Sequence, residues 1–415
     1  MMETLELTPE ELLDAEEEAR TDAVRNWSRR LETLVIFRDI LQDQAIRDFQ
    51  TALRFLGRER TERALSPLAA FEARIFDQGG DWSRYLARLV SESENVCIRK
   101  CGGGPLNAAL LGALERELSF LQSLSQLKLE HLPEIPSFFT GWTTSEVDIP
   151  GDYRRRMEQV GKVGYGVFAR YRVFTVRDGH LQPVKHPDPQ RLFELPGYER
   201  EREPIVANTE ALLEGRPANN VLLYGDAGTG KSSTVKALVN EYADRGLRLV
   251  EVKKNQLYEL PELMDTLAEN PLKFLLFIDD LSFTVNDDNF AALKAILEGS
   301  AGGQAENVAV YATSNRRHLI KETLSEREGD DIHAGDTRQE LMSLAARFGL
   351  TVTFQVPDRN RYLLIVKNLA EQYGLDLGET ELAVRAEAFA IRAGGRSARV
   401  AKQFAELCKA GVLHS

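Results

Sequence analysis

The fold of this chain is decided by the stretch Gly225-Asp-Ala-Gly-Thr-Gly-Lys-Ser232, which follows the apolar run Val221-Leu-Leu-Tyr224. The stretch matches the pattern G-x-x-x-x-G-K-[S/T] at every position. Residues 233–242, which come next, have a helical pattern. A buried strand, a glycine-rich turn and a helix in this order predict one βα unit of a parallel α/β sheet.

The chemistry of this turn indicates nucleotide phosphates as its ligand. Glycines let backbone N–H groups wrap around phosphates, and the N-terminus of the following helix adds a favourable dipole. We expect Lys231 to reach the β- and γ-phosphates of ATP and Ser232 to bind Mg²⁺. The predicted nucleotide-binding residues of this segment are Gly225, Asp226, Ala227, Gly228, Thr229, Gly230, Lys231, Ser232 and Ser233.

A second apolar run, Phe274-Leu-Leu-Phe-Ile278, ends in Asp279-Asp280. An apolar strand that ends in acids is the Walker B pattern of nucleotide-binding proteins. We expect Asp279 to hold Mg²⁺, and Asp280 to act as the general base or to orient the attacking water. The alternative is a solvated acidic turn after a buried strand. The position of this pair after the glycine-rich turn favours the functional interpretation.

A third apolar run, residues 308–312, leads into Thr313-Ser-Asn315. In doubly wound sheets the ligand binds at the carboxyl edge of the strands, where this polar segment is expected to lie. Asn315 is therefore predicted to position the attacking water against the γ-phosphate. The same residue is suited to cap a helix at residues 316–320, and the two roles are compatible.

Short apolar strands alternate with helical segments between residues 195 and 357. Strands are predicted at residues 220–224, 247–252, 274–278, 308–313 and 350–354. This alternation predicts an α/β domain whose parallel sheet is covered by helices on both faces. Residues 358–415 have a helical pattern only, which predicts a small C-terminal helical domain.

Residues 1–145 are predicted to form a helical N-terminal domain. Apolar residues recur there at three- and four-residue steps, in residues 31–56, 85–90 and 106–129. The three tryptophans, Trp27, Trp82 and Trp142, are expected to pack in its core. Residues 146–194 are predicted to be a β-hairpin linker, because the β-rich residues 163–176 precede the turn Arg177-Asp-Gly-His180 and a proline-rich stretch.

The composition limits the classes of partner. The 415 residues suit two or three domains, and a hydrophobic content of 43% allows sizeable cores. The net charge of −12 disfavours nucleic acid and anionic membranes as partners. A local exception is Arg154-Arg-Arg156 with the aromatic residues around it, which is either a nucleic-acid or partner surface or, more commonly, a solvated face.

The cysteines and the N-terminus indicate the compartment. Three cysteines, Cys97, Cys101 and Cys408, are too few for a disulfide framework. The Glu-rich N-terminus has no signal-peptide pattern, and no apolar run is long enough to span a membrane. We therefore expect a cytoplasmic protein. Cys97 and Cys101 have no nearby set of further zinc ligands and are expected to be buried thiols.

The order of these motifs resembles that of the AAA+ ATPases over residues 195–410. A closer resemblance is to the bacterial ATPases filed as domain of unknown function 815. The stretches that carry it lie at residues 224–233, 278–283, 311–318 and Arg347-Phe-Gly349. The resemblance implies a P-loop doubly wound parallel sheet of the AAA+ type over residues 195–357, with residues 358–415 as a helical lid.

The resemblance also implies roles for two arginines. Arg347 is implied to be the arginine finger that completes the ATP site of a neighbouring subunit, and this role implies a ring-like homo-oligomer. A helix C-terminal arginine that interacts with the helix dipole is the alternative. Gly394-Gly-Arg-Ser-Ala-Arg399 resembles the second-sensor motif, with Arg396 as the first choice and Arg399 left open. Gly197-Tyr-Glu199 resembles the segment near the adenine, and a packed or surface role is equally open.

Two departures from the family pattern bear on function. Many AAA+ members carry Asp-Glu where this chain carries Asp279-Asp280, and this difference predicts slower hydrolysis. Peptide-threading members carry an aromatic–hydrophobic–glycine loop, which residues 253–259 lack. Tyr258 is accordingly expected to be a packed helix residue.

Three functions follow as hypotheses. The first is an ATPase that binds Mg-ATP and hydrolyses it at subunit interfaces to remodel or regulate an unknown protein partner. The second is a slow-hydrolysing nucleotide-dependent scaffold or switch. The third is a DNA-associated loader, which the acidic net charge disfavours.

Overall fold

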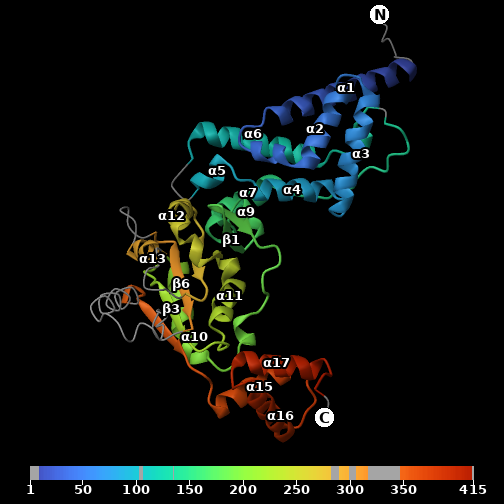
Figure 1. The fold of residues 1–415 in the computed structure, drawn as a ribbon. Coiled ribbons are helices and arrows are strands. Elements are labelled where there is room, and N and C mark those ends of the chain that lie inside the picture. Colours follow the sequence, from blue (N-terminus) through green and yellow to red (C-terminus); the bar gives the residue numbers. More distant parts are fainter. Residues whose placement is uncertain are drawn as a thin grey trace, which may run out of the picture. The chain divides into compact units, whose positions relative to one another are not determined.

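The computed structural model describes residues 9–101, 106–133, 135–281, 289–298, 305–315 and 346–413. Two compact units make up the chain (Figure 1). The first comprises Met1–Val160 and Gly164–Arg170, and the second comprises Gly161–Val163 and Tyr171–Ser415. Each unit has a hydrophobic core of its own.

The first unit is helical, as the spacing of its apolar residues predicted. Its longer helices are α1 (Pro9–Glu32), α2 (Gln44–Leu56), α3 (Thr61–Asp77), α4 (Trp82–Glu92), α6 (Ala108–Ser125) and α7 (Ile149–Glu158). Its short helices are η1 (Arg38–Gln42), α5 (Val96–Lys100), η2 (Leu129–His131) and α9 (Val167–Arg170), while α8 (Val160–Val163) lies in sequence where the two units meet. Several of these helices begin at a side-chain cap: Asp43 accepts from the amide of Ile46, for example.

Aromatic side chains form the centre of this core. The rings of Phe49 and Phe71 lie 4.4 Å apart, and the rings of Phe71 and Trp142 lie 4.8 Å apart. Both buried indoles use their polar atom: Trp82 Nε1 donates to the Leu124 carbonyl and Trp142 Nε1 to that of Leu127. The predicted packing of the tryptophans is confirmed for these two, and Trp27 packs partly buried against the same core.

The first periodic stretch, residues 31–56, does not form one continuous helix, although its periodicity alone predicts one. α1 ends at Glu32, and η1 precedes the start of α2. The Glu117 carboxylate of α6 accepts hydrogen bonds from the amides of Val35, Ile36 and Phe37, at distances between 2.7 and 3.2 Å. These three amides point at one anion, which fixes the chain in a turn there.

The second unit contains a seven-stranded sheet in the order β2-β1-β4-β5-β6-β3-β7. The strands are β1 (Val173–Arg177), β2 (His180–Pro183), β3 (Val221–Gly225), β4 (Leu247–Val252), β5 (Lys273–Ile278), β6 (Val308–Ser314) and β7 (Leu350–Phe354). All neighbours pair in parallel except β1 and β2. The predicted α/β class and mostly parallel sheet are therefore confirmed.

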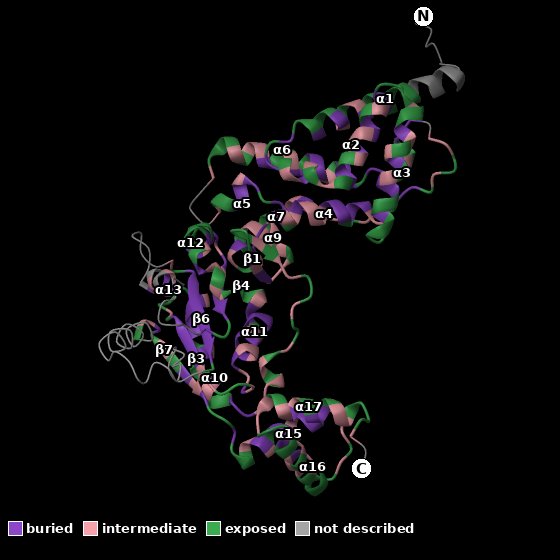
Figure 2. Ribbon diagram, viewed as in Figure 1, coloured by how far each residue is buried: buried purple, intermediate pink, exposed green. Residues whose placement is uncertain are grey.

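Helices cover the sheet and keep its central strands from solvent. α10 (Glu199–Leu213), α11 (Lys231–Tyr242), α12 (Leu260–Ala268) and α13 (Asn289–Glu298) alternate with the strands, together with the short helices η3 (Leu192–Glu194), η4 (Ala243–Arg245) and η5 (Lys254–Glu259). Figure 1 shows α11 and α13 on opposite sides of the strands. Every residue of β6 is buried, as Figure 2 shows for the middle of the sheet. Its two buried faces explain its continuous apolar sequence.

The predicted hairpin exists, but it differs from the prediction in extent and place. β1 and β2 are joined at Asp178 and Gly179, which have φ angles of 52° and 74°. β1 also pairs in parallel with β4, so the hairpin forms an edge of the main sheet rather than a separate linker. The preceding residues contain the helical turns α8 and α9 instead of an extended strand, because Gly164 and Gly166 adopt positive φ angles that interrupt it.

Three helices follow the sheet: α15 (Arg359–Tyr373), α16 (Glu379–Arg392) and α17 (Ala398–Lys409). Asp358 caps α15 by accepting from the amide of Arg361, and Ser397 caps α17 by accepting from the amide of Val400. The predicted helical C-terminal region is confirmed. None of the helices in the described part of the chain is both long and apolar enough to cross a membrane.

Candidate functional site

The glycine-rich turn, residues 225–232, connects β3 to α11. Gly225 has a φ angle of 134°, and a Cβ atom there would lie 1.9 Å from the Phe354 carbonyl oxygen. Gly228 has a φ angle of 77°, and its Cβ would lie 3.1 Å from the Arg399 Cβ. Glycine is therefore needed at both positions, by conformation and by the close approach of β7 and α17.

This turn borders a cavity of about 500 Å³. Residues 227–233 form one wall, and the ends of β5 and β6 contribute Asp279, Asp280, Thr313 and Asn315. The segment before α10 and the C-terminal helices form the rest of the lining. Because β3, β6 and β5 are neighbouring parallel strands, their carboxyl ends meet at one edge of the sheet. The structure thus brings together the residues that the sequence predicted from three separate motifs.

The acidic residues are joined to the turn by short hydrogen bonds. Ser232 Oγ donates to Asp279 Oδ1 over 2.6 Å. Asn315 Nδ2 donates to Asp280 Oδ1 over 2.7 Å. The Ser232 hydroxyl and the Asp279 carboxylate therefore lie side by side, and both are oxygen groups. Asp280, the next residue, is hydrogen-bonded to the Asn315 amide.

Lys231 is buried between the turn and β6. Its ammonium group donates to the carbonyl oxygens of Gly225 and Asp226, at 2.8 and 2.7 Å, and to Asn315 Oδ1 at 2.9 Å. Burial lowers the pKa of Lys231, and the carboxylates of Asp226, Asp279 and Asp280 oppose this effect. The Lys231 side chain is therefore a nearly buried cation at the cavity, and its three donors are all used on oxygens of this chain.

Asp280 has an unusual backbone conformation. Its φ angle is 53°, in the left-handed region that residues with a Cβ atom rarely adopt. Aspartate is among the residues that tolerate this region best, and such conformations cluster at functional sites. The conformation places a strained residue directly at the cavity.

Another part of the cavity lining comes from Tyr198, which precedes α10, and from α15. Tyr198 is buried beside the apolar side chains of Ile365 and Leu369. Its hydroxyl donates to the Gln355 carbonyl over 2.7 Å, and burial raises the pKa of Tyr198 to about 12, so the phenol is neutral. The Arg361 guanidinium lies 5.0 Å from the centre of its ring. The segment that includes Gly197, Tyr198 and Glu199 therefore holds a packed tyrosine at the cavity wall.

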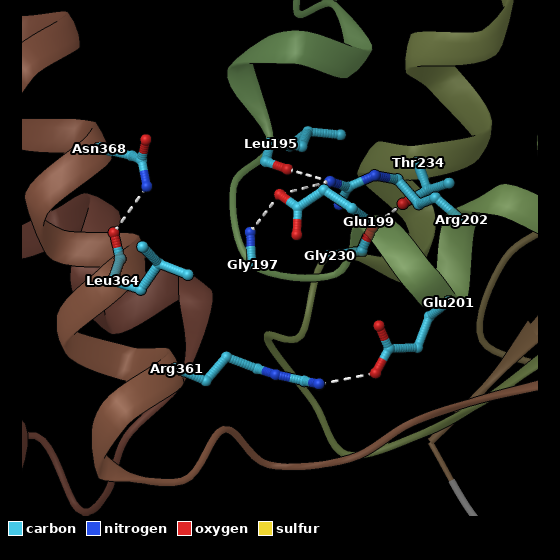
Figure 3. A network of polar contacts seen from close by, with 10 residues as sticks. All are labelled: Leu195, Gly197, Glu199, Glu201, Arg202, Gly230, Thr234, Arg361, Leu364 and Asn368. Atoms are coloured by element: carbon cyan, nitrogen blue, oxygen red, sulfur yellow. Dashed lines mark hydrogen bonds and ion pairs between the residues drawn. The ribbon is translucent and has the colours of Figure 1, made fainter.

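One ion pair connects α10 to the C-terminal helices (Figure 3). Arg361 of α15 pairs with Glu201 of α10 over 2.6 Å. Arg202, whose side chain is 9% exposed, donates to the Leu195 carbonyl and to Glu199, and it lines the cavity. Sequence reasoning did not identify Arg202 as a site residue, because nothing in its local pattern distinguishes it from the surface charges around it.

The two arginines of the Gly394–Arg399 segment have different surroundings. Arg396 forms an ion pair with Glu387 of α16 over 2.7 Å and does not line the cavity. Arg399 lines the cavity, and its amide donates to the Gly228 carbonyl over 3.0 Å. Lys402, one turn further along α17, lines it too. The structure therefore brings Arg399 to the cavity and not Arg396, the first choice from the sequence.

Arg347 does not line this cavity. It is half-buried and lies shortly before β7, where Gly349 packs against Asn219 so closely that a Cβ would meet its side-chain oxygen at 2.2 Å. Most of the helix predicted before Arg347 lies outside the described residues. So do the helix predicted at residues 316–320 and the last two residues of the Ile278–Phe283 motif, Ser282 and Phe283.

Two further expectations were wrong. Tyr258 is not packed: it is 69% exposed on η5, where Leu257 is the buried residue. Cys101, which follows α5, is only half-buried and packs against the small cluster of Ile98, Val160 and Tyr165, although Cys97 is buried as expected. Its Sγ donates to the Cys97 carbonyl. On η5, a short helix, Leu257 is buried and the neighbouring Tyr258 is exposed.

The basic run of α7 is largely neutralised by nearby acids. Arg154 pairs with Glu115 over 2.5 Å, and Arg155 pairs with Asp152. Arg170 of α9 pairs with Glu92 over 3.0 Å. These pairs reduce the positive potential that a nucleic-acid surface requires.

Comparison with known proteins gives one result beyond the geometry. A family profile with the description "protein of unknown function (DUF815)" matches residues 168–412. No curated protein matches the chain. The matched region runs from before β1 to the end of α17, and so includes every residue of the cavity described above. Because this match covers more than half of the chain, the protein belongs to the DUF815 family.

Proposed function

We propose that the chain is a P-loop ATPase of the AAA+ type, which binds Mg-ATP in this cavity and hydrolyses it. The observation that carries the proposal is the meeting of Lys231, Ser232, Asp279, Asp280 and Asn315 from three strand ends beside one glycine-rich turn. A doubly wound sheet with ligand at its carboxyl edge is the matching fold type.

The phosphates are bound by the turn and the start of α11. Backbone amides and the helix dipole favour an anion at this position. Lys231 supplies a positive charge whose depressed pKa reflects burial. Its present acceptors are neutral oxygens of Gly225, Asp226 and Asn315, so a phosphate oxygen competes favourably for the same donors.

The donor set beside the turn fits Mg²⁺. Magnesium prefers oxygen ligands and binds through one or two protein groups together with phosphates and water. Ser232 Oγ and Asp279 Oδ1, which are 2.6 Å apart, are groups of this kind. When bound, Mg²⁺ neutralises charge that develops on the β- and γ-phosphate oxygens.

Asp280 and Asn315 orient the attacking water. The Asp280 carboxylate is the base, and the Asn315 amide holds it through the 2.7 Å hydrogen bond. Arg399 of α17 serves as the second sensor, since it lines the cavity and Arg396 does not. Tyr198, Ile365 and Leu369 form an apolar wall for the nucleobase.

Arg347 is proposed to act on a neighbouring subunit. It lies outside its own chain's cavity, as an arginine finger does. This role makes the active form a ring of identical subunits with head-to-tail contacts. The energy of hydrolysis then serves to remodel or regulate a protein partner, with the helical first unit as the recognition part.

A slow nucleotide-dependent switch is the second candidate. It is favoured by the short Asp280 side chain, which is held by Asn315 and by a strained backbone. Both candidates share the same nucleotide site and differ in turnover. A DNA loader has less support, because the basic run of α7 is paired with acids.

The test is ATP turnover per subunit, measured against protein concentration for wild type, Asp280→Asn and Arg347→Ala. Each variant is expected to keep nucleotide binding and to lose at least about 100-fold in turnover. A mixture of the two variants should recover part of the activity, where an intact Asp280 meets an intact Arg347. No recovery on mixing, with full activity of Arg347→Ala alone, would contradict the shared site. Binding without turnover in wild type would favour the switch.

A further inference from the structure

One hydroxyl at the end of β6 connects both acids of the site. Thr313 is 1% exposed. Its Oγ1 donates to Asp279 Oδ1 over 2.6 Å and accepts from the amide of Asp280 over 2.9 Å. The Thr313 carbonyl accepts from the amide of Leu281 over 2.7 Å. Three consecutive residues after β5 are therefore held by a single threonine.

These hydrogen bonds begin where the regular pairing of β5 and β6 stops. The last pair in register is Ile278 with Ala312. Asp279 and Asp280 follow in a turn, and Asp280 adopts its left-handed conformation there. An isolated residue with a Cβ atom prefers to leave this conformation. The bond from the Asp280 amide to Thr313 Oγ1 opposes that relaxation.

The direction of the hydrogen bonds follows from the proton count. The Thr313 hydroxyl has one proton, which it donates in a hydrogen bond to the Asp279 carboxylate, a group that only accepts. An oxygen lone pair of the same hydroxyl is then left for the Asp280 amide. Asp279 Oδ1 also accepts from Ser232 Oγ, so its orientation is fixed from two sides.

We propose that Thr313 is a positioning residue of the ATPase site. Its hydroxyl orients Asp279 towards Ser232 for Mg²⁺, and it holds Asp280 in the backbone conformation that lets Asn315 bind its carboxylate. The proposal rests on the proposed function, since it assigns Thr313 to the metal and water ends of the same site. It does not depend on the phosphate contacts of Lys231 or on the apolar wall for the nucleobase.

The matched variants are Thr313→Val, which keeps the shape and removes the hydroxyl, and Thr313→Ser, which keeps the hydroxyl. The first measurement is binding of the fluorescent nucleotide mant-ATP to the full chain, in EDTA and over a MgCl₂ titration. Thr313→Val should bind within about twofold of wild type in EDTA and should need roughly tenfold more Mg²⁺ for half of the magnesium-dependent signal. Thr313→Ser should stay within about threefold of wild type in both.

The second measurement separates the Michaelis constant from the turnover number. Thr313→Val should lower kcat by about 10- to 100-fold at saturating Mg²⁺, with KM for ATP changed by less than about threefold. Thr313→Ser should restore most of the turnover. If Thr313→Val does not fold, Thr313→Ala removes the same hydroxyl without a methyl group beside Asp279 and takes its place.

Three results would overturn the proposal. A hydroxyl-free variant that lowers only the melting temperature, with normal Mg²⁺ dependence and kcat, would show a purely structural bond. A serine variant as defective as valine would show that the hydroxyl is not the cause. Wild type that binds no nucleotide, with or without Mg²⁺, would end the proposed function and this proposal with it; that failure is recognised because it appears in wild type.

Discussion

Arg399 and Arg396 show how a single residue's neighbours decide its role. The two arginines are three positions apart in one motif, and both carry the same charge. Glu387 of α16 binds the Arg396 guanidinium through two of its nitrogens. Arg399 has its amide on the Gly228 carbonyl and its side chain at the cavity. The difference depends on how α16 packs, which no local pattern reveals.

Replacing each arginine separately tests this assignment. Arg399→Ala should weaken ATP binding by about tenfold, because one charge-assisted contact to the nucleotide is lost. Arg396→Ala should leave ATP affinity within about twofold, since its partner is Glu387. Isothermal titration with ATP measures both. The reverse ranking would show that Arg396 reaches the nucleotide.

The depressed pKa of Lys231 predicts a pH effect on binding. An ordinary lysine stays charged up to a pKa of 10.5, whereas burial lowers the pKa of Lys231 below that value. As pH rises through the lowered pKa, the ammonium loses its proton and its attraction for phosphate. ATP affinity should therefore begin to fall at a pH below 10.5.

The same shift has a definite sign for stability. Between the lowered pKa and 10.5, the unfolded chain holds a proton on Lys231 that the folded chain has released. The contribution of this group to the free energy of unfolding therefore rises with pH across that window.

A matched control for the predicted fall in ATP affinity at alkaline pH is Lys231→Arg. Its guanidinium stays charged, so the ATP affinity of this variant should not show that fall. An equal fall in both proteins would assign the effect to another group.

At the scale of elements, the glycine-rich turn is held between β7 and α17. Asp226 donates its amide to the Phe354 carbonyl over 3.1 Å, and the Arg399 amide binds Gly228. The turn therefore depends on elements more than a hundred residues away in the chain. The motif itself could be predicted because its spacing is local, but these supports could not.

Gly228→Ala tests how closely α17 approaches the turn. The alanine would have to keep a φ angle of 77°, which residues with a Cβ atom rarely adopt. Its Cβ would also lie only 3.1 Å from the Arg399 Cβ and from Ser397 Oγ. We expect a loss of about 1–2 kcal/mol in the free energy of unfolding and weaker ATP binding. Gly378→Ala is the control, because no atom lies within 4 Å of its added Cβ. Denaturant unfolding of the full chain measures both, and equal effects would contradict the close packing.

The roles of the residues at the strand ends could be predicted only in part from the sequence. Asp279, Asp280 and Asn315 could be assigned to one edge because apolar runs mark each strand and parallel strands end together. Thr313 stood in the same stretch, yet its role depends on the register of β5 and β6, which sequence alone does not supply. The hairpin was predicted from its turn, but its pairing with β4 is a long-range contact and was missed.

At the scale of the whole molecule, the chain consists of a helical unit and an α/β unit. The family match covers the α/β unit from before β1 to α17, and the cavity lies entirely within it. The first unit has its own aromatic core, and most of it lies outside the matched region. In the proposed function, the α/β unit binds the nucleotide and the helical unit recognises the partner.

The most direct measurement is an equilibrium titration of the full chain with ATP and Mg²⁺, for wild type, Lys231→Ala and Lys236→Ala. Both lysines belong to α11, but Lys236 pairs with Glu251 over 3.4 Å and does not line the cavity. The account predicts about one ATP per chain for wild type and Lys236→Ala, and at least about tenfold weaker binding for Lys231→Ala. No binding by folded wild type, or equal binding by all three proteins, would contradict the central claim.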